Sequence, residues 1–323
     1  QSNPFGNEHK TAVHRVEEAV YLYQNMQAVA KMAETMGCDR TANQYIKKAD
    51  AIKSSIISYM WDENTKFFYD LHPGDLKKAL KSKNFAGFMP ARCDIADGYG
   101  DELFAHLSSE FNTPYPIPTT ATDSPAFSPD NTWKAGPYAS DEEPYHYGCC
   151  WNGPTWNYAN SLVIDALGSY IQRSGSKQLP NTFANLFLKW CEEQNPDENA
   201  VPNSCEHYNP YTGEPFRDIK DYFHSFFIDI VMKYIVGIVP GDKDTITVAP
   251  IDIGVERLMV RDIPYRGHSI NFLWDSGKEM DKLTLNVDGK IIFTGRTLKK
   301  ITIYLKGNDS FKFSAHLSLP FKY

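Results

Sequence analysis

The spacing of apolar residues divides the chain into a helical part and a β part. Over the first two thirds, apolar residues recur every three or four positions, which predicts amphipathic helices. The expected helices cover residues 11–36, 39–60, 97–109, 155–172, 181–194 and 222–236. Gly37 is expected to end the first helix, because glycine readily adopts the left-handed conformation. The segment WDENTKFFYDLH predicts a turn or hairpin after the second helix.

After Pro240 the pattern changes to alternating apolar and polar residues, in short runs separated by Gly, Asp and Asn. This alternation predicts antiparallel strands, with Asp288-Gly289 as a hairpin turn. We therefore expect a mainly α fold with a β tail. A helical domain would cover residues 1–240, and a small antiparallel β-sandwich would cover residues 241–323, with the boundary near 238–244.

A long irregular segment, from NTPYPIP to YHYGCC, separates the third and fourth expected helices. Connections of this length are uncommon in compact domains unless they are functional or disordered. Because the segment is rich in Tyr and Trp as well as Pro, we interpret it as an ordered wall beside a pocket. A disordered linker is the alternative.

Composition narrows the class of protein. The chain of 323 residues is 42% hydrophobic and 23% charged, which is typical of a soluble globular protein. Its net charge of -7 argues against nucleic acid or an anionic membrane as the main partner.

We find no run of apolar residues long enough to span a bilayer. The first ten residues lack the layout of a signal peptide, although a cleaved one could have been removed before residue 1. The aromatic content of 14% suits flat, amphipathic ligands such as sugar rings.

The 6 cysteines are too dispersed to indicate a disulfide scaffold. The sequence has neither a C-x-x-C pair nor an H-E-x-x-H motif, so we expect no metal site and no cofactor. Cys149 and Cys150 are adjacent. They either form a strained disulfide or are two partly buried thiols, so the cysteines do not indicate whether the protein is in an oxidising or a reducing compartment.

The segment WNGPTW places Trp151, Asn152 and Trp156 at the expected start of a helix. Pro154 suits the first helical turn, and Gly153 lets the backbone bend into it. A polar ligand could meet free backbone N–H groups there. The alternative is a capped helix with its tryptophans packed inward.

The segment CEHYNPYTGEP places a carboxylate, Glu206, beside His207 in a loop. Asn209-Pro210 and Thr212-Gly213 exclude a regular helix or a central strand at this point. A third segment, DYFHSFFIDIVMKYIVGIVP, places His224 near the first turn of an apolar helix. A histidine at such a position is either a structural hydrogen-bonding residue or a ligand contact.

These three segments, in this order, resemble the six-hairpin glycosidases. That group comprises the (α/α)6-barrel hydrolases of glycoside hydrolase families 63 and 37, and the likeness is strongest to the bacterial mannosylglycerate-hydrolase-like branch. Its members typically have a Trp-x-Gly-Pro helix start, a Glu-x-Tyr-x-Pro-x-x-Gly loop and a Tyr-x-His-Ser helix leading to Gly-Leu-x-Pro. The tail DIPYRGHSINFLWD also looks like the β domain that often follows. The resemblance covers nearly the whole chain.

The resemblance implies an inverting α-glycosidase that acts on an oligosaccharide or glycoside. In such enzymes a carboxylic acid protonates the glycosidic oxygen while a carboxylate roughly 6.5–9.5 Å away activates water on the opposite face. By motif position Glu206 is the general base. The residues that would line the sugar subsite are Trp151, Asn152, Trp156, Tyr208 and His224.

The general acid departs from the family pattern. Relatives carry it in a short Gly-rich stretch before a helix, and the acid that precedes the first helix here is Glu8. Either Glu8 is the general acid, or the acid lies upstream of residue 1. A closed barrel contains six helical pairs, whereas the apolar spacing predicts about six helices. We therefore expect the C-terminal half of the toroid, with a missing N-terminal half of the same polypeptide as the segment that completes it. By resemblance, the protein is expected in the periplasm or outside the cell.

Two rival functions share the helical architecture. A toroidal polysaccharide lyase needs a Tyr or His base and cations that neutralise a uronate, and the three segments contain few cations. A degenerate hydrolase that lost its acid would be a non-catalytic carbohydrate-binding protein.

Overall fold

The computed structural model describes residues 13–125, 127–130, 132–133, 146–147, 151–194, 204–216, 226–241, 245–277, 281–298, 300–305 and 312–314. The chain divides into two compact units. The first unit consists of Gln1–Thr182 and Leu186–Phe226, and the second of Phe183–Asn185 and Phe227–Tyr323. Helices dominate the described part of the first unit, and antiparallel strands dominate that of the second.

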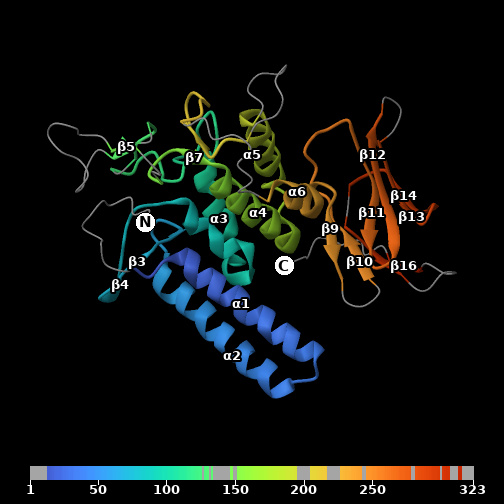
Figure 1. Ribbon diagram of the computed structural model, residues 1–323, viewed down its shortest axis with the longest axis horizontal. Helices are drawn as coiled ribbons and strands as arrows, with labels where there is room; N and C mark the ends of the chain where they lie inside the picture. The colour runs from blue at the N-terminus through green and yellow to red at the C-terminus, as the bar shows by residue number, and fades with distance from the viewer. Residues whose placement is uncertain are drawn as a thin grey trace. The chain divides into compact units, whose positions relative to one another are not determined.

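The first unit opens with an antiparallel helical pair, α1 (Val16–Thr35) and α2 (Asp39–Ser55), which lie side by side (Figure 1). The buried residues of α1 recur at the predicted spacing: Val16, Val20, Tyr23, Ala30 and Ala33. Gly37 follows α1 with a φ of 71°, which confirms that it ends the helix. A single π-helical turn, Ile56–Met60, extends α2 to the predicted end of the second helix.

Four further α-helices lie in the described residues: α3 (Gly100–Ala105), α4 (Asn157–Ser174), α5 (Pro180–Glu193) and α6 (Phe227–Ile230). Short helical turns accompany them at Phe85–Arg92, Asp94–Ala96, His106–Ser108 and Val231–Ile235. The turn Phe85–Arg92 was not predicted, because Gly87 and Pro90 break the apolar spacing there. Gly87 is needed in that turn, since a Cβ atom would lie 2.1 Å from the Phe67 ring.

Four two-stranded ladders connect these helices. They are β1 (Trp61–Asp62) with β2 (Phe67–Phe68), β3 (Leu71–His72) with β4 (Asp75–Ala79), β5 (Thr132–Trp133) with β6 (His146–Tyr147), and β7 (Thr155–Trp156) with β8 (His207–Tyr208). The β1–β2 pair confirms the predicted hairpin. Its turn is closed by Asp62, whose carboxylate accepts a hydrogen bond from the Thr65 N–H group at 2.8 Å.

The second unit contains two four-stranded antiparallel sheets (Figure 1). The first has the order β16-β15-β10-β9, and the second the order β11-β12-β13-β14. Their bounds are β9 (Ile238–Pro240), β10 (Thr245–Val248), β11 (Arg257–Tyr265), β12 (His268–Ser276), β13 (Asp281–Val287), β14 (Lys290–Gly295), β15 (Ile301–Tyr304) and β16 (Lys312–Ser314). Asp288 and Gly289 have φ angles of 50° and 80°, as a tight hairpin turn requires, which confirms that prediction.

Alternate residues of both sheets are buried in one apolar cluster. The first sheet contributes Ile246, Val248, Ile301 and Ile303. The second contributes Ile270, Phe272, Leu283, Leu285 and Val287. The alternation that predicted these strands therefore reflects the apolar cluster that the sheets share.

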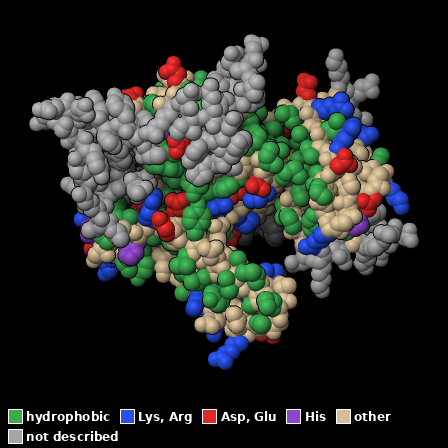
Figure 2. Space-filling model, in the orientation of Figure 1, with side chains coloured by type: hydrophobic (Ala, Val, Ile, Leu, Met, Phe, Trp, Pro, Cys, Tyr) green, Lys and Arg blue, Asp and Glu red, His purple; other side chains and the backbone are tan. Residues whose placement is uncertain are grey.

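Apolar side chains are exposed along the helical pair α1–α2 (Figure 2). They include Leu22, Met32, Met36 and Ile46, and Met36 is 77% exposed. Across the described part of the chain, no helix combines the length and hydropathy needed to cross a membrane.

Candidate active site

The two segments that carry the candidate residues of the first unit pair directly with each other. Strand β7, from WNGPTW, and strand β8, from CEHYNP, form an antiparallel ladder in which Thr155 faces Tyr208 and Trp156 faces His207. The sequence predicted both segments as loop or helix-start motifs, but it gave no sign that they form one ladder. The ladder places Glu206 immediately before β8, next to the tryptophan segment.

This pairing corrects the predicted start of the fourth helix. Helix α4 begins at Asn157, and Trp156 is its N-cap with extended backbone angles of φ -115° and ψ 130°. Pro154 therefore lies before the helix, and its predicted place in the first helical turn is wrong. The strand pairing with β8 accounts for the difference, because residues that are extended in a ladder are not available to the helix.

A stack of aromatic rings runs through the ladder. The Trp151 and Trp156 rings are 4.1 Å apart with an interplanar angle of 17°. Trp156 in turn stacks on His207 at 4.4 Å and 8°, and His207 stacks on Phe216 at 5.5 Å. Trp156 and His207 are buried, whereas Trp151 is only partly buried, so the stack reaches the surface at Trp151.

Glu206 lies at the edge of this stack with a small part of its surface accessible. The residue is 8% exposed, and its Oε2 atom lies 3.7 Å from His207 Nδ1. The backbone just before it is held from two sides. The Cys205 N–H group donates to the Tyr208 hydroxyl at 2.6 Å, and the Cys205 carbonyl accepts from Asn157 Nδ2 at 2.7 Å.

Asn157 is a supporting residue that sequence reasoning missed. It is fully buried as the first residue of α4, and its Nδ2 atom also donates to Ser204 Oγ at 2.9 Å. Its Oδ1 atom accepts from Trp190 Nε1 at 2.6 Å. One amide therefore joins α4 and α5 to the backbone that leads into Glu206. A polar residue of low helix propensity directly after WNGPTW was the available signal.

The turn after β8 explains the residues NPYTGEP. Asn209 Oδ1 accepts hydrogen bonds from the N–H groups of Tyr211 and Thr212 at 2.9 and 3.2 Å, which is an Asx turn. Gly213 has a φ of 72°, and a Cβ atom there would lie 2.4 Å from the Tyr115 ring. The predicted turn is confirmed, and its glycine is required both by conformation and by space.

The tryptophan segment is anchored to residues 119 and 128 of the irregular segment. The Thr119 hydroxyl donates to the Pro154 carbonyl at 3.0 Å and accepts from the Gly153 N–H group at 3.1 Å. The Ser128 N–H group donates to the Asn152 carbonyl at 2.8 Å. Thr119 and Ser128 are therefore ordered against the tryptophan segment. That the irregular segment forms a wall beside a pocket stays a prediction.

A second polar group lies beside Trp151 and was not predicted. The Tyr158 ring meets the Trp151 ring edge-on at 6.0 Å, and its hydroxyl lies 2.8 Å from the Tyr21 hydroxyl and 3.1 Å from Glu17 Oε1. Burial, the main cause, raises the pKa of both tyrosines, so their hydroxyl groups stay protonated. A carboxylate, two hydroxyl donors and an indole ring are thus gathered on one partly exposed surface.

Several predicted site residues are placed differently from a simple pocket lining. Asn152, Trp156 and Tyr208 are 2%, 2% and 1% exposed, so the structure gives them packing and positioning contacts. Their contact with a sugar stays a prediction. Glu8, His224, Cys149 and Cys150 lie outside the described residues. In the part of the chain that is described, no group of three or more His, Cys, Asp or Glu residues is arranged as a metal site.

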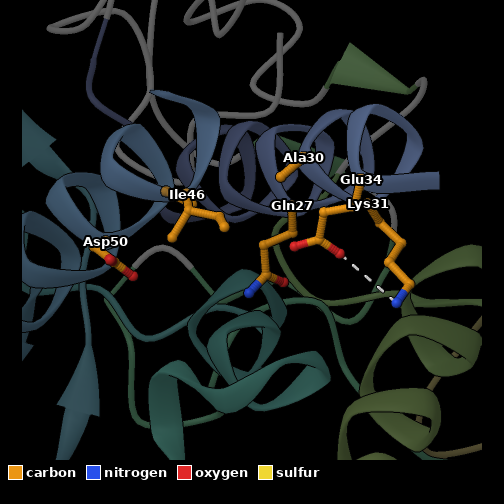
Figure 3. Close-up of a pocket in the computed structure, with 7 residues that line it drawn as sticks. Gln27, Ala30, Lys31, Glu34, Ile46 and Asp50 are labelled. Carbon is orange, nitrogen blue, oxygen red and sulfur yellow. Dashed lines mark ion pairs between the residues drawn. The ribbon is translucent and has the colours of Figure 1, made fainter. Parts of the chain in front are cut away.

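A separate groove lies between α1 and α2 (Figure 3). Its volume is about 190 Å³, and Gln27, Ala30 and Lys31 from α1 line it together with Ile46 and Asp50 from α2. It contains none of the aromatic rings described above. An ion pair between Lys31 and Glu34 at 3.8 Å occupies one side. We therefore place the candidate site at Glu206 and not in this groove.

Comparison with solved structures supports the helical fold. A structure named "Sialidase" is similar over 91% of this chain and 27% of its own, with 20% sequence identity and a TM-score of 0.78. The neutral trehalase Nth1 from Saccharomyces cerevisiae is similar over 68% of this chain and 38% of its own, with 16% identity and a TM-score of 0.50. Both likenesses concern the fold alone.

Sequence comparison identifies the family. An uncharacterized protein of Borreliella burgdorferi is 30% identical over 146 residues, which are 44% of this chain and 27% of that protein. The match thus spans only about a quarter of that relative. Residues 2–225 match the family described as the mannosylglycerate hydrolase MGH1-like glycoside hydrolase domain. The chain belongs to this family of glycoside hydrolases.

Proposed function

We propose that the chain contributes the general base, Glu206, to the inverting hydrolysis of an α-glycosidic bond. The observation that carries this proposal is the placement of Glu206. It is a slightly exposed carboxylate at the edge of an aromatic stack, and the backbone before it is fixed by Tyr208 and Asn157. A base that activates water needs this combination of access and a fixed position.

In the proposed reaction a water molecule attacks the anomeric carbon on the face opposite to the leaving group. Glu206 accepts a proton from that water as the new C–O bond forms. A second carboxylic acid donates its proton to the glycosidic oxygen as the old C–O bond breaks. This acid is either Glu8 or a carboxyl group of a segment upstream of residue 1.

The partly exposed surface at Trp151 is the proposed sugar subsite. An indole ring can stack on the apolar face of a sugar, while a carboxylate such as Glu17 can accept hydrogen bonds from its hydroxyl groups. Tyr158 connects the two, because it contacts both Trp151 and Glu17. Asn152, Trp156, Tyr208 and His224 are proposed to complete or support this subsite.

The proposed architecture is the C-terminal half of an (α/α)6 toroid over residues 1–240, followed by a β-sandwich over residues 241–323. Exposed apolar residues on the α1–α2 pair, such as Leu22 and Met32, support a further covering segment. An N-terminal half of the same polypeptide is the proposed cover. Action in the periplasm or outside the cell is part of the same proposal.

The test is to replace the proposed base. Glu206→Gln keeps the shape of the side chain but removes its ability to accept a proton, so kcat should fall at least about 100-fold with the fold intact. Glu214→Gln is the matched control. Glu214 is exposed on the same turn, so this substitution should leave kcat unchanged. Mannosylglycerate and a panel of α-linked disaccharides, including trehalose, are the substrates to try.

A Glu206→Gln enzyme with wild-type turnover would remove Glu206 from the mechanism. Binding of these sugars by the wild-type protein without hydrolysis would favour the non-catalytic carbohydrate-binding function instead.

A further inference from the structure

Glu193 is a buried carboxylic acid that has no hydrogen-bonding partner among the described residues. It is the last residue of α5, it is 0% exposed, and neither carboxyl oxygen bonds to any residue that the structure describes. Burying an unpaired carboxylate costs far more free energy than burying the neutral acid. Burial accordingly raises the pKa of Glu193 well above that of an ordinary glutamate.

Helix α5 supports the backbone that leads into Glu206. One turn before Glu193, Trp190 donates its indole N–H to Asn157, and Asn157 donates to the Cys205 carbonyl. Residues three apart lie on one face of a helix, so Glu193 and Trp190 share the buried face of α5. The Glu193 carboxyl group is therefore in one buried layer with Trp190, Asn157 and Cys205.

Tyr208 holds the other side of that backbone. The Tyr208 hydroxyl accepts the Cys205 N–H hydrogen bond, and the residue is 1% exposed. Burial is the main cause of the raised pKa of Tyr208, and the charge of Glu193 is a further cause. Burial accounts for the raised pKa of Glu193.

We propose that Glu193 is a positioning residue for Glu206. In its uncharged form, Glu193 packs within the layer that holds Cys205 and Tyr208. In its ionised form, it displaces the backbone that carries Glu206. The proposal rests on the proposed role of Glu206 as the base. It predicts that the backbone around Cys205 and Glu206 becomes less ordered at alkaline pH. The cause would be the ionisation of Glu193, which does not contact the substrate.

The sign of the pH effect follows from the raised pKa. A group whose pKa is higher in the folded protein stabilises it fully below its ordinary value, about 4.3 for glutamate. That contribution is lost as the pH rises towards the folded-state pKa. Glutamine is neutral at every pH, so Glu193→Gln should behave like the uncharged wild-type protein.

The experiment compares the wild-type protein with Glu193→Gln and with Glu192→Gln, in which the exposed neighbour is changed. Hydrogen exchange of the Cys205 amide is measured from about pH 5 to 9, and the variant-to-wild-type ratio at each pH cancels the intrinsic chemistry of exchange. We expect wild-type protection to fall at least about tenfold relative to Glu193→Gln as the pH rises. Glu192→Gln should follow the wild type.

The kinetic measurement separates positioning from general destabilisation. Loss of the proton from the general acid lowers kcat at alkaline pH in every variant, so the comparison is between the pH values at which kcat declines. In the wild type the decline should begin at lower pH than in Glu193→Gln, with KM unchanged. Equal Cys205 protection in all three proteins at every pH would overturn the proposal, as would lower protection in Glu193→Gln than in the wild type. Retained activity in Glu206→Gln would reject the base and leave the exchange result intact, so the two proposals fail separately.

Discussion

At the scale of single residues, the position of Glu206 depends on groups that belong to other elements. Cys205 is held on one side by Tyr208 and on the other by Asn157, at 2.6 and 2.7 Å. His207, on the other side of Glu206, is fixed between the rings of Trp156 and Phe216. The backbone on both sides of Glu206 is thus held by residues of other elements.

Asn157→Ala tests this support. The substitution removes hydrogen bonds to Ser204, Cys205 and Trp190 and leaves buried polar atoms without partners, so the free energy of unfolding should fall by about 3 kcal/mol. We expect kcat to fall more than KM rises, because the base moves while the sugar subsite remains. Denaturant unfolding and steady-state kinetics measure the two effects. Asn181→Ala, at an exposed position of α5, is the control, and an equal loss of kcat there would contradict the assignment.

At the scale of elements, the β7–β8 ladder and the turn after β8 form the framework of the site. The turn depends on Gly213, whose backbone is left-handed and whose Cα faces the Tyr115 ring. Tyr115 also donates its N–H group to the Pro210 carbonyl at 3.0 Å. The irregular segment and the Glu206 turn therefore hold each other in place.

Gly213→Ala and Gly175→Ala separate backbone strain from crowding. Both glycines have positive φ angles, 72° and 68°, but a Cβ atom at Gly175 meets open space. Gly175→Ala should therefore lower the free energy of unfolding by about 1 kcal/mol from strain alone. Gly213→Ala should lower it further and should also reduce kcat, because Tyr115 must move. Thermal unfolding and kinetics check both outcomes, and similar losses for the two variants would mean that the Tyr115 contact is unimportant.

Much of the fold was predictable from periodicity and turn chemistry. The spacing of Val16, Val20 and Tyr23 indicated α1, and Asp288-Gly289 indicated the β13–β14 turn, because each pattern reflects a local preference of the backbone. The turn Phe85–Arg92 and the strand at Thr155–Trp156 were not predicted. In the turn, Gly87 and Pro90 break the apolar spacing. The strand depends on pairing with β8, which is distant in sequence, so a local pattern does not reveal it.

The candidate site was predictable in part for the same reason. Glu206 was singled out because a carboxylate among turn residues is unusual, and its role as the base was inferred from the resemblance to the six-hairpin glycosidases and stays a prediction. Asn157, Glu193 and the Glu17–Tyr158 pair were missed, since an Asn, a Glu or a Tyr in a helix has no distinctive pattern. Their significance lies in burial and in contacts across more than 30 residues, such as Trp190 to Asn157.

At the scale of the whole molecule, family membership assigns the chain to the glycoside hydrolases, and the proposed mechanism adds the stereochemistry. The matched region spans only about a quarter of its Borreliella burgdorferi relative, at 27% of that protein. The proposed base and aromatic subsite lie among the described residues of the first unit, whereas Glu8, the acid proposed within this chain, lies outside the described residues. The proposed mechanism therefore combines Glu206 as a proposed base with a proposed acid.

The stereochemistry of the first product tests the central claim most directly. The α-glycoside that the enzyme hydrolyses is followed by proton NMR during the first minutes, before the anomers of the released sugar equilibrate. Direct attack of water activated by Glu206 on the face opposite to the leaving group predicts that the attacked sugar appears first as its β anomer, and that trehalose gives equal amounts of α- and β-glucose. Initial release of the attacked sugar as its α anomer would contradict the account, because retention requires a covalent intermediate and would make the assigned carboxylate a nucleophile instead of a base.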